Sequence, residues 1–361
     1  MLERLWKRIL RRGPYSLWNL PAFLLWLASF AYRAGFALKR TLCGKRIKVS
    51  VPVISVGNIT VGGSGKTPLV AGLARDLLAD GFRVGIVSSG YGRSDDQPFV
   101  ESGHKVREMA VTRTGDETML LAQQVPDAWF SVARVKSVAA QKLADSDKVD
   151  LIIIDDGFQH FGLERDLDLV TYDSSLTDRF LKPFPYGLLR ESKQALARTD
   201  IIVITHSESA EHIDQLRREL NSFAPKAAIY FAGYQAAQIV GRATRRPVKY
   251  LEDKAVYLFA GVGNFKALET QVSALSARIT FALELSDHQR YDQEFLQEIK
   301  AMVDQSSPSL VLTTLKDWVK IGDFDFGREF YYLDLLLELE PGEGKLSNEV
   351  KTRLNLVVRG A

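Results

Sequence analysis

Residues 55 to 68 read S-V-G-N-I-T-V-G-G-S-G-K-T-P, and the rest of the chain is interpreted outward from this stretch. Gly62, Gly63 and Gly65 leave a loop in which successive backbone N–H groups can turn toward a polyphosphate. Lys66 then reaches the outer phosphate oxygens. The stretch therefore predicts a phosphate-binding loop, and Ser64 and Pro68 complete it.

The flanks of this loop match its expected context. The apolar run over 53–56 predicts a buried strand, and apolar residues at helical spacing over 69–78 predict a helix that ends at Asp80-Gly81. Thr67 offers a hydroxyl to Mg²⁺. One position departs from the strict motif, because Thr60 stands where a glycine is usual; Gly57 or the pair at 62 and 63 can supply the same backbone freedom. The alternative is an ordinary glycine-rich turn.

Length and composition indicate a globular protein with two α/β domains. The chain has 361 residues, of which 46% are hydrophobic and 25% charged. Cys43 is the only cysteine, so an intrachain disulfide is impossible, as suits a reducing compartment. The pattern restarts near residue 225. We expect a membrane-associating segment over 1–40, a P-loop NTPase-like α/β/α domain over 41–225 and a smaller α/β domain over 226–361.

The N-terminal segment concentrates positive charge next to an apolar stretch. Residues 1 to 48 carry eleven Lys or Arg against one acid, although the whole chain has a net charge of only +3. This distribution favours an anionic membrane surface over nucleic acid. The thirteen uncharged residues over 20–32 are too few for the roughly 20 of a spanning helix. A signal peptide and a buried helix are the alternatives; we favour an interfacial helix.

Three further stretches carry candidate site residues. The apolar run over 149–154 predicts a central strand that ends in Asp155 and Asp156, which are suited to hold Mg²⁺ beside a nucleotide. Asp116 and Glu117 precede a helix and can act as caps or as catalytic groups. His288, next to an aspartate, is either a surface residue or a general acid/base.

A proline-rich loop over 183–191 adds Arg190, which either clamps a phosphate or pairs with Glu191. The stretch over 94–105 reads as a surface excursion. The remaining expected strands lie at 83–87, 169–172, 201–204, 228–231, 256–260, 279–283, 310–313 and 330–333, and the remaining helices at 119–124, 212–220, 265–277 and 293–303.

Taken together, these stretches resemble the tetraacyldisaccharide 4′-kinase family of lipid A biosynthesis. The matching motifs, in order, are G-N-I-T-V-G-G-S-G-K-T-P at 57–68, S-G-Y-G at 89–92, G-D-E at 115–117, D-D-G-F-Q-H at 155–160, L-R-E at 189–191, G-V-G-N at 261–264, D-H-Q-R-Y at 287–291 and K-D at 316–317. The combination is specific, although each motif alone is weak.

The resemblance implies two α/β/α domains facing a cleft and an N-terminal helix on the cytoplasmic face of the inner membrane. It implies transfer of the γ-phosphate of ATP, with Mg²⁺, to the 4′-hydroxyl of a lipid disaccharide 1-phosphate. Asp116 would be the base and His288 its partner, while Lys66 neutralises phosphate charge. Further nucleotide or magnesium contacts are expected from Tyr91, Glu117, Gln159, His160, Arg190 and Glu191.

Two departures from the family and two rival interpretations, one of them less favoured, remain. Ser89 stands where the family commonly has arginine, and Arg93 is a candidate to replace its charge. Leu-Ser rather than Phe-Pro precedes the Asp-His pair. The main rival is a membrane-associated nucleotide switch, but the chain lacks the Asn-Lys-x-Asp guanine reader of switch GTPases. A non-catalytic docking module is disfavoured by the intact Lys66, Thr67 and aspartates. Protein partners are not indicated.

Overall fold

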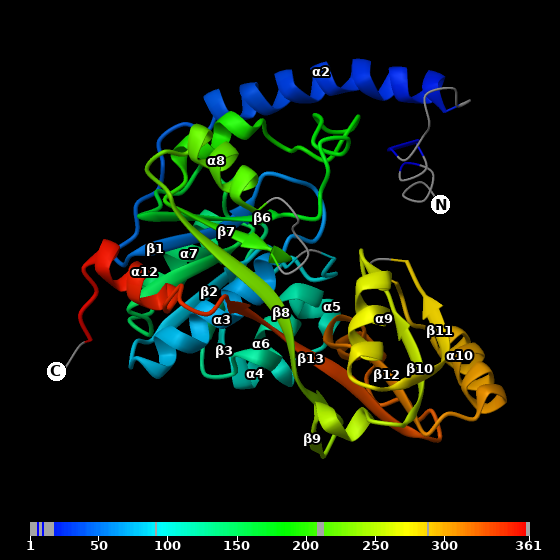
Figure 1. The fold of residues 1–361 in the computed structure, drawn as a ribbon. Coiled ribbons are helices and arrows are strands. Elements are labelled where there is room, and N and C mark those ends of the chain that lie inside the picture. Colours follow the sequence, from blue (N-terminus) through cyan, green and yellow to red (C-terminus); the bar gives the residue numbers. More distant parts are fainter. Residues whose placement is uncertain are drawn as a thin grey trace.

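A computed structural model describes residues 6, 9–10, 18–90, 92–207, 213–286 and 289–358. Their strands form a single 13-stranded sheet in the order β11-β10-β12-β13-β8-β7-β6-β1-β5-β2-β4-β3, with β9 paired to β8 (Figure 1). The strands are β1 (Val53–Asn58), β2 (Val84–Ser88), β3 (Phe99–Ser102), β4 (Trp129–Val132), β5 (Leu151–Asp155), β6 (Leu167–Asp173), β7 (Ile201–Thr205), β8 (Ala228–Val240), β9 (Arg245–Pro247), β10 (Ala255–Ala260), β11 (Arg278–Glu284), β12 (Leu310–Thr314) and β13 (Glu329–Leu339).

Helices cover this sheet on both faces. They are α2 (Asn19–Thr41), α3 (Lys66–Ala79), α4 (Gly103–Arg107), α5 (Val111–Thr114), α6 (Asp116–Gln124), α7 (Lys136–Ala144), α8 (Ile213–Phe223), α9 (Phe265–Ala274), α10 (Gln293–Ser306), α11 (Leu315–Ile321) and α12 (Leu346–Leu354), with short 3₁₀ helices at Lys193–Arg198 and Val248–Leu251. The predicted α/β class is confirmed.

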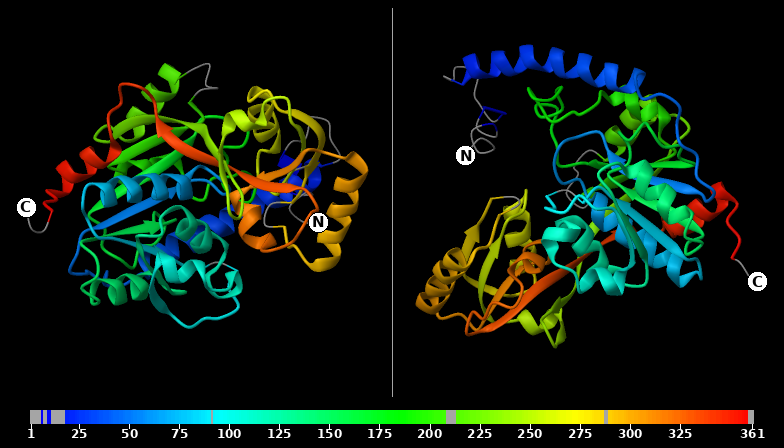
Figure 2. Two further views of the ribbon diagram at one scale, coloured as in Figure 1. Left: turned by 90° about the horizontal axis from the view of Figure 1, so that it is seen from below. Right: turned by 180° about the vertical axis from the view of Figure 1, so that it is seen from behind.

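Two long strands join the two ends of the sheet. β8 pairs in parallel with β7 over 228–232 and then antiparallel with β13, which in turn pairs with β12. We call the part built on β1 to β7 the phosphate-loop half and the part built on β10 to β12 the C-terminal half. Figure 2 shows the two halves side by side, linked through β8 and β13.

The central strands of each half are buried on both faces. Every residue of β1, β5 and β7 is buried, as are all residues of β10. Such continuous apolar strands need helices on both sides. In the phosphate-loop half, Leu69, Val70 and Leu73 of α3 pack on one face, and residues of α7 pack with the other. Parallel pairing then brings the loops after these strands to one edge, where open α/β sheets bind ligands.

The N-terminal helix α2 lies along the outside of the phosphate-loop half, on the side away from β3 and α4 (Figure 1). Leu20, Phe23, Leu24, Trp26, Leu27, Phe30 and Leu38 of this helix are exposed. On its other side Tyr32 packs edge-on against Phe184, with 5.1 Å between the ring centroids. Phe36 packs in the same way against Phe161, with 5.8 Å between the centroids. One side of α2 is therefore anchored to the protein while a wide apolar side is left uncovered.

The helix α2 extends well beyond the uncharged stretch over 20–32. It has 23 residues, and an 18-residue window has a mean hydropathy of 1.3, so by length and composition it could cross a membrane. The estimate from uncharged residues over 20–32 missed the turns that follow, because those turns include charged residues among apolar ones. An amphipathic helix in the interface has the same length range, so helix length does not choose between the two arrangements.

Most of the predicted elements are confirmed within a few residues, including the end of α3 at Ala79 before Gly81, whose φ is +90°. The stretch over 94–105, predicted as a surface excursion, also contains regular structure. It contains β3, which pairs antiparallel with β4, and the start of α4. The strand is short and sits at the sheet edge, so its apolar pattern is too brief to stand out.

Candidate functional site

The phosphate loop connects β1 to α3 as the sequence predicts. Gly62 and Gly65 adopt φ values of +109° and +83°, in the region where a side chain would be strained. Gly65 immediately precedes α3, and within the described residues the N-terminus of this helix has no side-chain cap. Its backbone N–H groups and the helix dipole are thus directed at the space where an anion binds.

The departure at Thr60 and the role of Gly57 both have a structural reason. Thr60 is buried and accepts a hydrogen bond from Nδ2 of Asn58 at 3.2 Å, with no left-handed backbone required of it. Gly57 does not supply loop freedom, contrary to expectation. A Cβ there would lie 2.5 Å from Cβ of Phe158, so its glycine allows β1 to approach the segment after β5.

Ser64 holds the loop from inside. Its buried hydroxyl accepts a hydrogen bond from Nδ2 of Asn58 at 2.7 Å and lies 2.8 Å from the hydroxyl of Thr171 on β6. These contacts tie the loop to two strands, and a loop held in one shape binds phosphate without an ordering cost. Thr67 and Pro68 lie in the first turn of α3, where proline is tolerated.

Asp156 brings two cations together directly after β5. Its Oδ1 lies 3.5 Å from Nζ of Lys66, and Nη1 of Arg190 donates to both carboxylate oxygens at 3.0 Å. Burial opposes ionisation of this carboxyl, but Lys66 and Arg190 outweigh it and lower its pKa to about 2. The structure therefore brings together candidate residues of the phosphate loop, the D-D-G-F-Q-H motif and the L-R-E motif, which are far apart in the sequence.

The backbone around Asp156 is turned by an unusual conformation. Asp156 has a φ of +51°, which costs energy for a non-glycine residue and is typical of functional sites. The carbonyl oxygens of Asp155 and Asp156 both accept hydrogen bonds of 2.7 Å from Nζ of Lys136. Burial lowers the pKa of Lys136, and the two aspartates oppose that effect.

Asp155 is the residue best suited to a magnesium ion. It is buried, and among the described residues its Oδ1 has no hydrogen-bond partner. Burial, reinforced by the negative charge of Glu117, raises its pKa to about 7. A buried carboxylate oxygen without a partner is costly unless a cation or water meets it. The residues present thus fit the Mg²⁺ that a phosphate loop uses.

The described residues contain no large cluster of metal-ligating side chains. Within the described ranges, no group of three or more His, Cys, Asp or Glu side chains is arranged to hold a metal. Mg²⁺ bound with a nucleotide commonly takes one or two carboxylates and completes its shell with phosphate oxygens and water. Thr67 and Glu117 remain predicted contributors beside Asp155.

Glu191 and Gln159 lie in a hydrogen-bonded group next to this cluster. Glu191 accepts from Arg198 at 2.6 Å and from Nε2 of Gln159 at 3.0 Å, and the same Gln159 nitrogen donates to the carbonyl of Asn58 at 2.7 Å. Gln159 thus links the segment after β5 to the end of β1, and Glu191 links Gln159 to Arg198. A direct metal contact from Glu191 stays a prediction.

His160 closes the D-D-G-F-Q-H motif. Its Nε2 accepts a hydrogen bond from the backbone N–H of Ser137 at 3.1 Å. Burial, together with the charge of Lys136, lowers its pKa to about 4, so it is neutral near pH 7. A neutral imidazole in this place can accept or donate a hydrogen bond without adding charge.

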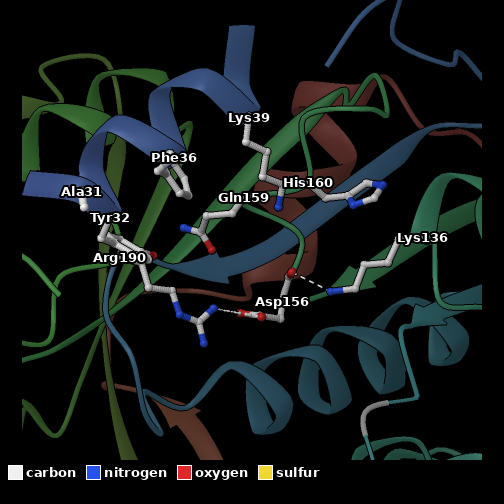
Figure 3. A pocket seen from close by; sticks show the side chains of 10 residues that line it. Ala31, Tyr32, Phe36, Lys39, Lys136, Asp156, Gln159, His160 and Arg190 are labelled. Atoms are coloured by element: carbon white, nitrogen blue, oxygen red, sulfur yellow. Dashed lines mark hydrogen bonds and ion pairs between the residues drawn. The ribbon is translucent and has the colours of Figure 1, made fainter. Parts of the chain in front are cut away.

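A cavity of about 550 Å³ joins this cluster to the N-terminal helix. Figure 3 shows Tyr32 and Phe36 of α2 pointing toward Gln159 and Arg190, with Asp156 and Lys136 on the opposite wall. Ala31, Gly35, Lys39 and His160 also line it. The cavity is therefore mainly apolar and aromatic on the helix side, with Lys39 as its charged residue there, and charged on the side of the phosphate loop.

Asp116 does not line this cavity. It is the first residue of α6, directly after the N-cap Gly115, and its Oδ2 lies 3.0 Å from Nζ of Lys320 on α11 of the C-terminal half. Its predicted partner His288 and the predicted nucleotide contact Tyr91 fall outside the described residues. The catalytic pairing of Asp116 with His288 stays a prediction.

Arg93 is engaged in its own loop. Its guanidinium donates to the carbonyl oxygens of Asp96 and Gln97, both at 3.0 Å. Ser89, which stands where the family commonly has arginine, lies directly after β2. We expected Arg93 to supply the missing positive charge to the site. Among the described residues, the hydrogen bonds of Arg93 all go to its own loop and none goes to the site.

Three charged residues of the site carry little signal in the sequence. Lys136 follows β4 at the start of α7, Arg198 pairs with Glu191, and Lys320 pairs with Asp116. Each becomes noticeable only when the fold brings it to a distant carboxylate or carbonyl. A lysine at a helix start, where cations are unfavourable, is the one local hint, and it applies to Lys136.

Comparisons with known proteins identify the family that this chain resembles. The family model described as tetraacyldisaccharide-1-P 4'-kinase (LpxK) matches residues 21–355. A tetraacyldisaccharide 4'-kinase of Syntrophobacter fumaroxidans is 34% identical over 333 residues, covering 90% of this chain and 85% of the relative. That of Desulfotalea psychrophila is 30% identical, covering 88% and 90%. The crystal structure of LpxK from Aquifex aeolicus in complex with ATP superimposes with a TM-score of 0.72 at 26% identity, covering 92% of this chain and 99% of that one.

Proposed function

The chain belongs to the tetraacyldisaccharide-1-P 4'-kinase family, and we propose that it transfers the γ-phosphate of ATP to the 4′-hydroxyl of a tetraacyldisaccharide 1-phosphate. One observation of the site carries this proposal beyond family membership. The cavity that holds Asp156 and Arg190 at one wall is lined by the apolar helix α2 at the other. A kinase whose acceptor is a lipid needs this combination of charged and apolar walls.

The phosphate-loop half supplies alignment and charge neutralisation, which are the main requirements of phosphoryl transfer. The loop at 62–65 and the start of α3 hold the β- and γ-phosphates. Lys66 and Arg190 lie on different segments of the chain, and their side chains meet at the carboxylate of Asp156. We place their positive charges beside the phosphoryl group as its negative charge is redistributed.

Asp155 would hold Mg²⁺, together with Thr67 of the phosphate loop and Glu117 of the G-D-E motif. When bound, the ion neutralises charge on the phosphate oxygens and fixes their orientation. Lys136 keeps the backbone of residues 155 and 156 in place by binding both carbonyl oxygens. Gln159, His160 and Glu191 support the same segment, and their contact with the nucleotide is part of this proposal.

The acceptor hydroxyl must lose a proton during transfer. We assign this proton to Asp116, with His288 orienting the carboxylate from the C-terminal half. Asp116 lies at the start of α6 and faces the C-terminal half through Lys320. The proposal supposes that the two halves approach the acceptor from opposite sides.

The acceptor enters along α2. Tyr32 and Phe36 offer apolar and aromatic surface to the disaccharide and the first atoms of its chains, while Lys39 and the basic N-terminal segment attract its 1-phosphate. The exposed apolar side of α2 would lie in the lipid. We therefore place the protein on the cytoplasmic face of the inner membrane, where ATP is supplied.

Transfer of labelled γ-phosphate from Mg²⁺-ATP to tetraacyldisaccharide 1-phosphate in detergent micelles tests this function. The intact chain should form a labelled bisphosphorylated lipid. Lys66→Ala should reduce the rate at least about 10³-fold, because the lysine neutralises transferred charge. Lys226→Ala, which removes a lysine outside the site, is the matched control and should leave the rate unchanged.

The rival nucleotide switch predicts a different result. ATP hydrolysis without any labelled lipid would contradict the kinase assignment and favour the switch. Labelled lipid formed equally well by Lys66→Ala would contradict the proposed role of the phosphate loop.

A further inference from the structure

The K-D motif at 316–317 lies outside the catalytic arrangement proposed above, yet its aspartate occupies a distinctive position. Asp317 on α11 is fully buried, with 0% of its surface exposed. A buried carboxylate is costly unless several hydrogen bonds compensate for the water it has lost. The contacts that compensate for this loss therefore identify what the side chain holds together.

Three segments donate hydrogen bonds to this carboxylate. The backbone N–H of Gly261 donates to Oδ2 at 3.0 Å, and the hydroxyl of Thr314 donates to the same oxygen at 2.8 Å. The hydroxyl of Tyr291 donates to Oδ1 at 2.8 Å. Burial, with the negative charge of Asp317 beside it, raises the pKa of Tyr291, which keeps its hydroxyl a donor.

These donors come from the same edge of the sheet. Gly261 follows β10, Tyr291 lies beyond the end of β11 and Thr314 ends β12, and these three strands are parallel neighbours. Ligand sites of open α/β sheets lie at this edge. A Cβ at Gly261 would lie 2.6 Å from the carbonyl of Ser286, so the loop after β10 also touches the loop after β11 closely.

The same helix reaches the other half of the protein. Lys320 lies one turn after Asp317 on α11, with only 9% of its side chain exposed, and its Nζ is 3.0 Å from Oδ2 of Asp116. α11 therefore contacts the proposed base on one side. One turn earlier on the same helix, Asp317 binds the hydroxyl of Tyr291, which lies three residues after His288 in the sequence.

We propose that Asp317 and Lys320 are positioning residues, which use the short helix α11 to hold the loops of the C-terminal half in a fixed relation to Asp116. The inference rests on the proposed function, since it takes Asp116 as the base. Neither residue needs to touch the substrate. A displacement of the reacting groups by about 1 Å can lower the rate up to roughly 10²-fold. Residues that only fix the position of Asp116 can therefore matter for catalysis.

Four single variants test the positioning roles in the lipid phosphorylation assay. Tyr291→Phe deletes one hydrogen bond to Asp317, and Lys320→Met deletes the cation while keeping most of the side-chain volume. Each should lower kcat roughly tenfold and leave the KM for ATP within about twofold. The matched controls are Tyr250→Phe, whose hydroxyl bonds Glu329 at 2.8 Å, and Lys266→Met, whose ammonium pairs with Glu269 at 2.7 Å. Both controls should leave kcat unchanged.

A double-variant comparison separates positioning from general stability. In an Asp116→Ala background Lys320→Met should cause no further loss, because the group that it positions is already absent. Lys320→Arg should recover much of the rate by restoring the charge. Unchanged kcat in Tyr291→Phe and Lys320→Met, or an increase in Lys320→Met, would overturn the inference.

The outcome also distinguishes this inference from the function on which it rests. Full activity of both positioning variants with loss in Lys66→Ala contradicts only the roles of Asp317 and Lys320. Absence of labelled lipid with the intact chain contradicts the proposed function itself.

Discussion

The two halves of the sheet hold their charged residues in different ways, each near the carboxyl ends of its own parallel strands. In the phosphate-loop half, Asp156 is partly exposed and contacts two cations, Lys66 and Arg190. In the C-terminal half, Asp317 is fully buried and accepts hydrogen bonds from Gly261, Tyr291 and Thr314. The first arrangement leaves the positive charges of Lys66 and Arg190 accessible to a phosphate. In the second, the buried carboxylate has a structural role, because it holds three segments together.

This contrast predicts that a substitution of Asp156 lowers the phosphorylation rate more than the other substitutions below. Asp156→Ala removes the carboxylate that orients Lys66 and Arg190, and both cations then lose their fixed positions. We expect kcat to fall about 10²- to 10³-fold, as when a charge-stabilising group is removed from an active site. Steady-state phosphorylation of the lipid acceptor measures it, with the exposed Asp127→Ala as control. A loss smaller than threefold would show that the ion cluster is not needed for alignment.

The contrast also explains how far the sequence predicts the molecule. The phosphate loop, the strand ending at Asp155 and most elements of both halves are predictable, because glycine placement and apolar runs are local signals. Arg190 and Asp156 were candidates for the same reason, although nothing local showed that they meet. Lys136, Lys320 and the role of Asp317 depend on contacts between segments far apart in the chain, and no local pattern encodes those contacts.

The N-terminal helix distinguishes the phosphate-loop half further, since it supplies this half with an exposed apolar surface. Replacing Phe23, Trp26 and Phe30 together with serine should weaken binding to vesicles with anionic lipids and lower kcat/KM for the lipid acceptor about tenfold. The KM for ATP should stay unchanged. Flotation with vesicles and assays in mixed micelles measure the two effects.

Val357→Ser is the matched control for the helix variant, because Val357 is an exposed apolar residue outside α2. If the triple variant binds vesicles as strongly as the intact chain, the membrane role of the exposed face of α2 is wrong. Equal losses for lipid and ATP would indicate damage to the fold rather than to docking.

The smallest expected effect concerns stability and pH at His160. Burial lowers the pKa of this histidine from 6.5 to about 4 in the folded protein. The unfolded chain therefore binds more protons between these values, and the contribution of His160 to stability is present above pH 6.5 and lost as the pH falls toward 4. Urea unfolding at pH 7 and pH 5 should show a smaller acid-induced loss in His160→Gln. An identical loss would contradict the lowered pKa.

The most direct test of the account is whether the two halves act as one catalytic unit. The measurement is a double-mutant cycle on the lipid phosphorylation rate with Asp116→Ala, His288→Ala and the double variant. If a base and its partner work together, each single variant should lower kcat about 10²-fold or more and the double variant should be little worse than either. Losses that multiply in the double variant would contradict a joint role for Asp116 and His288.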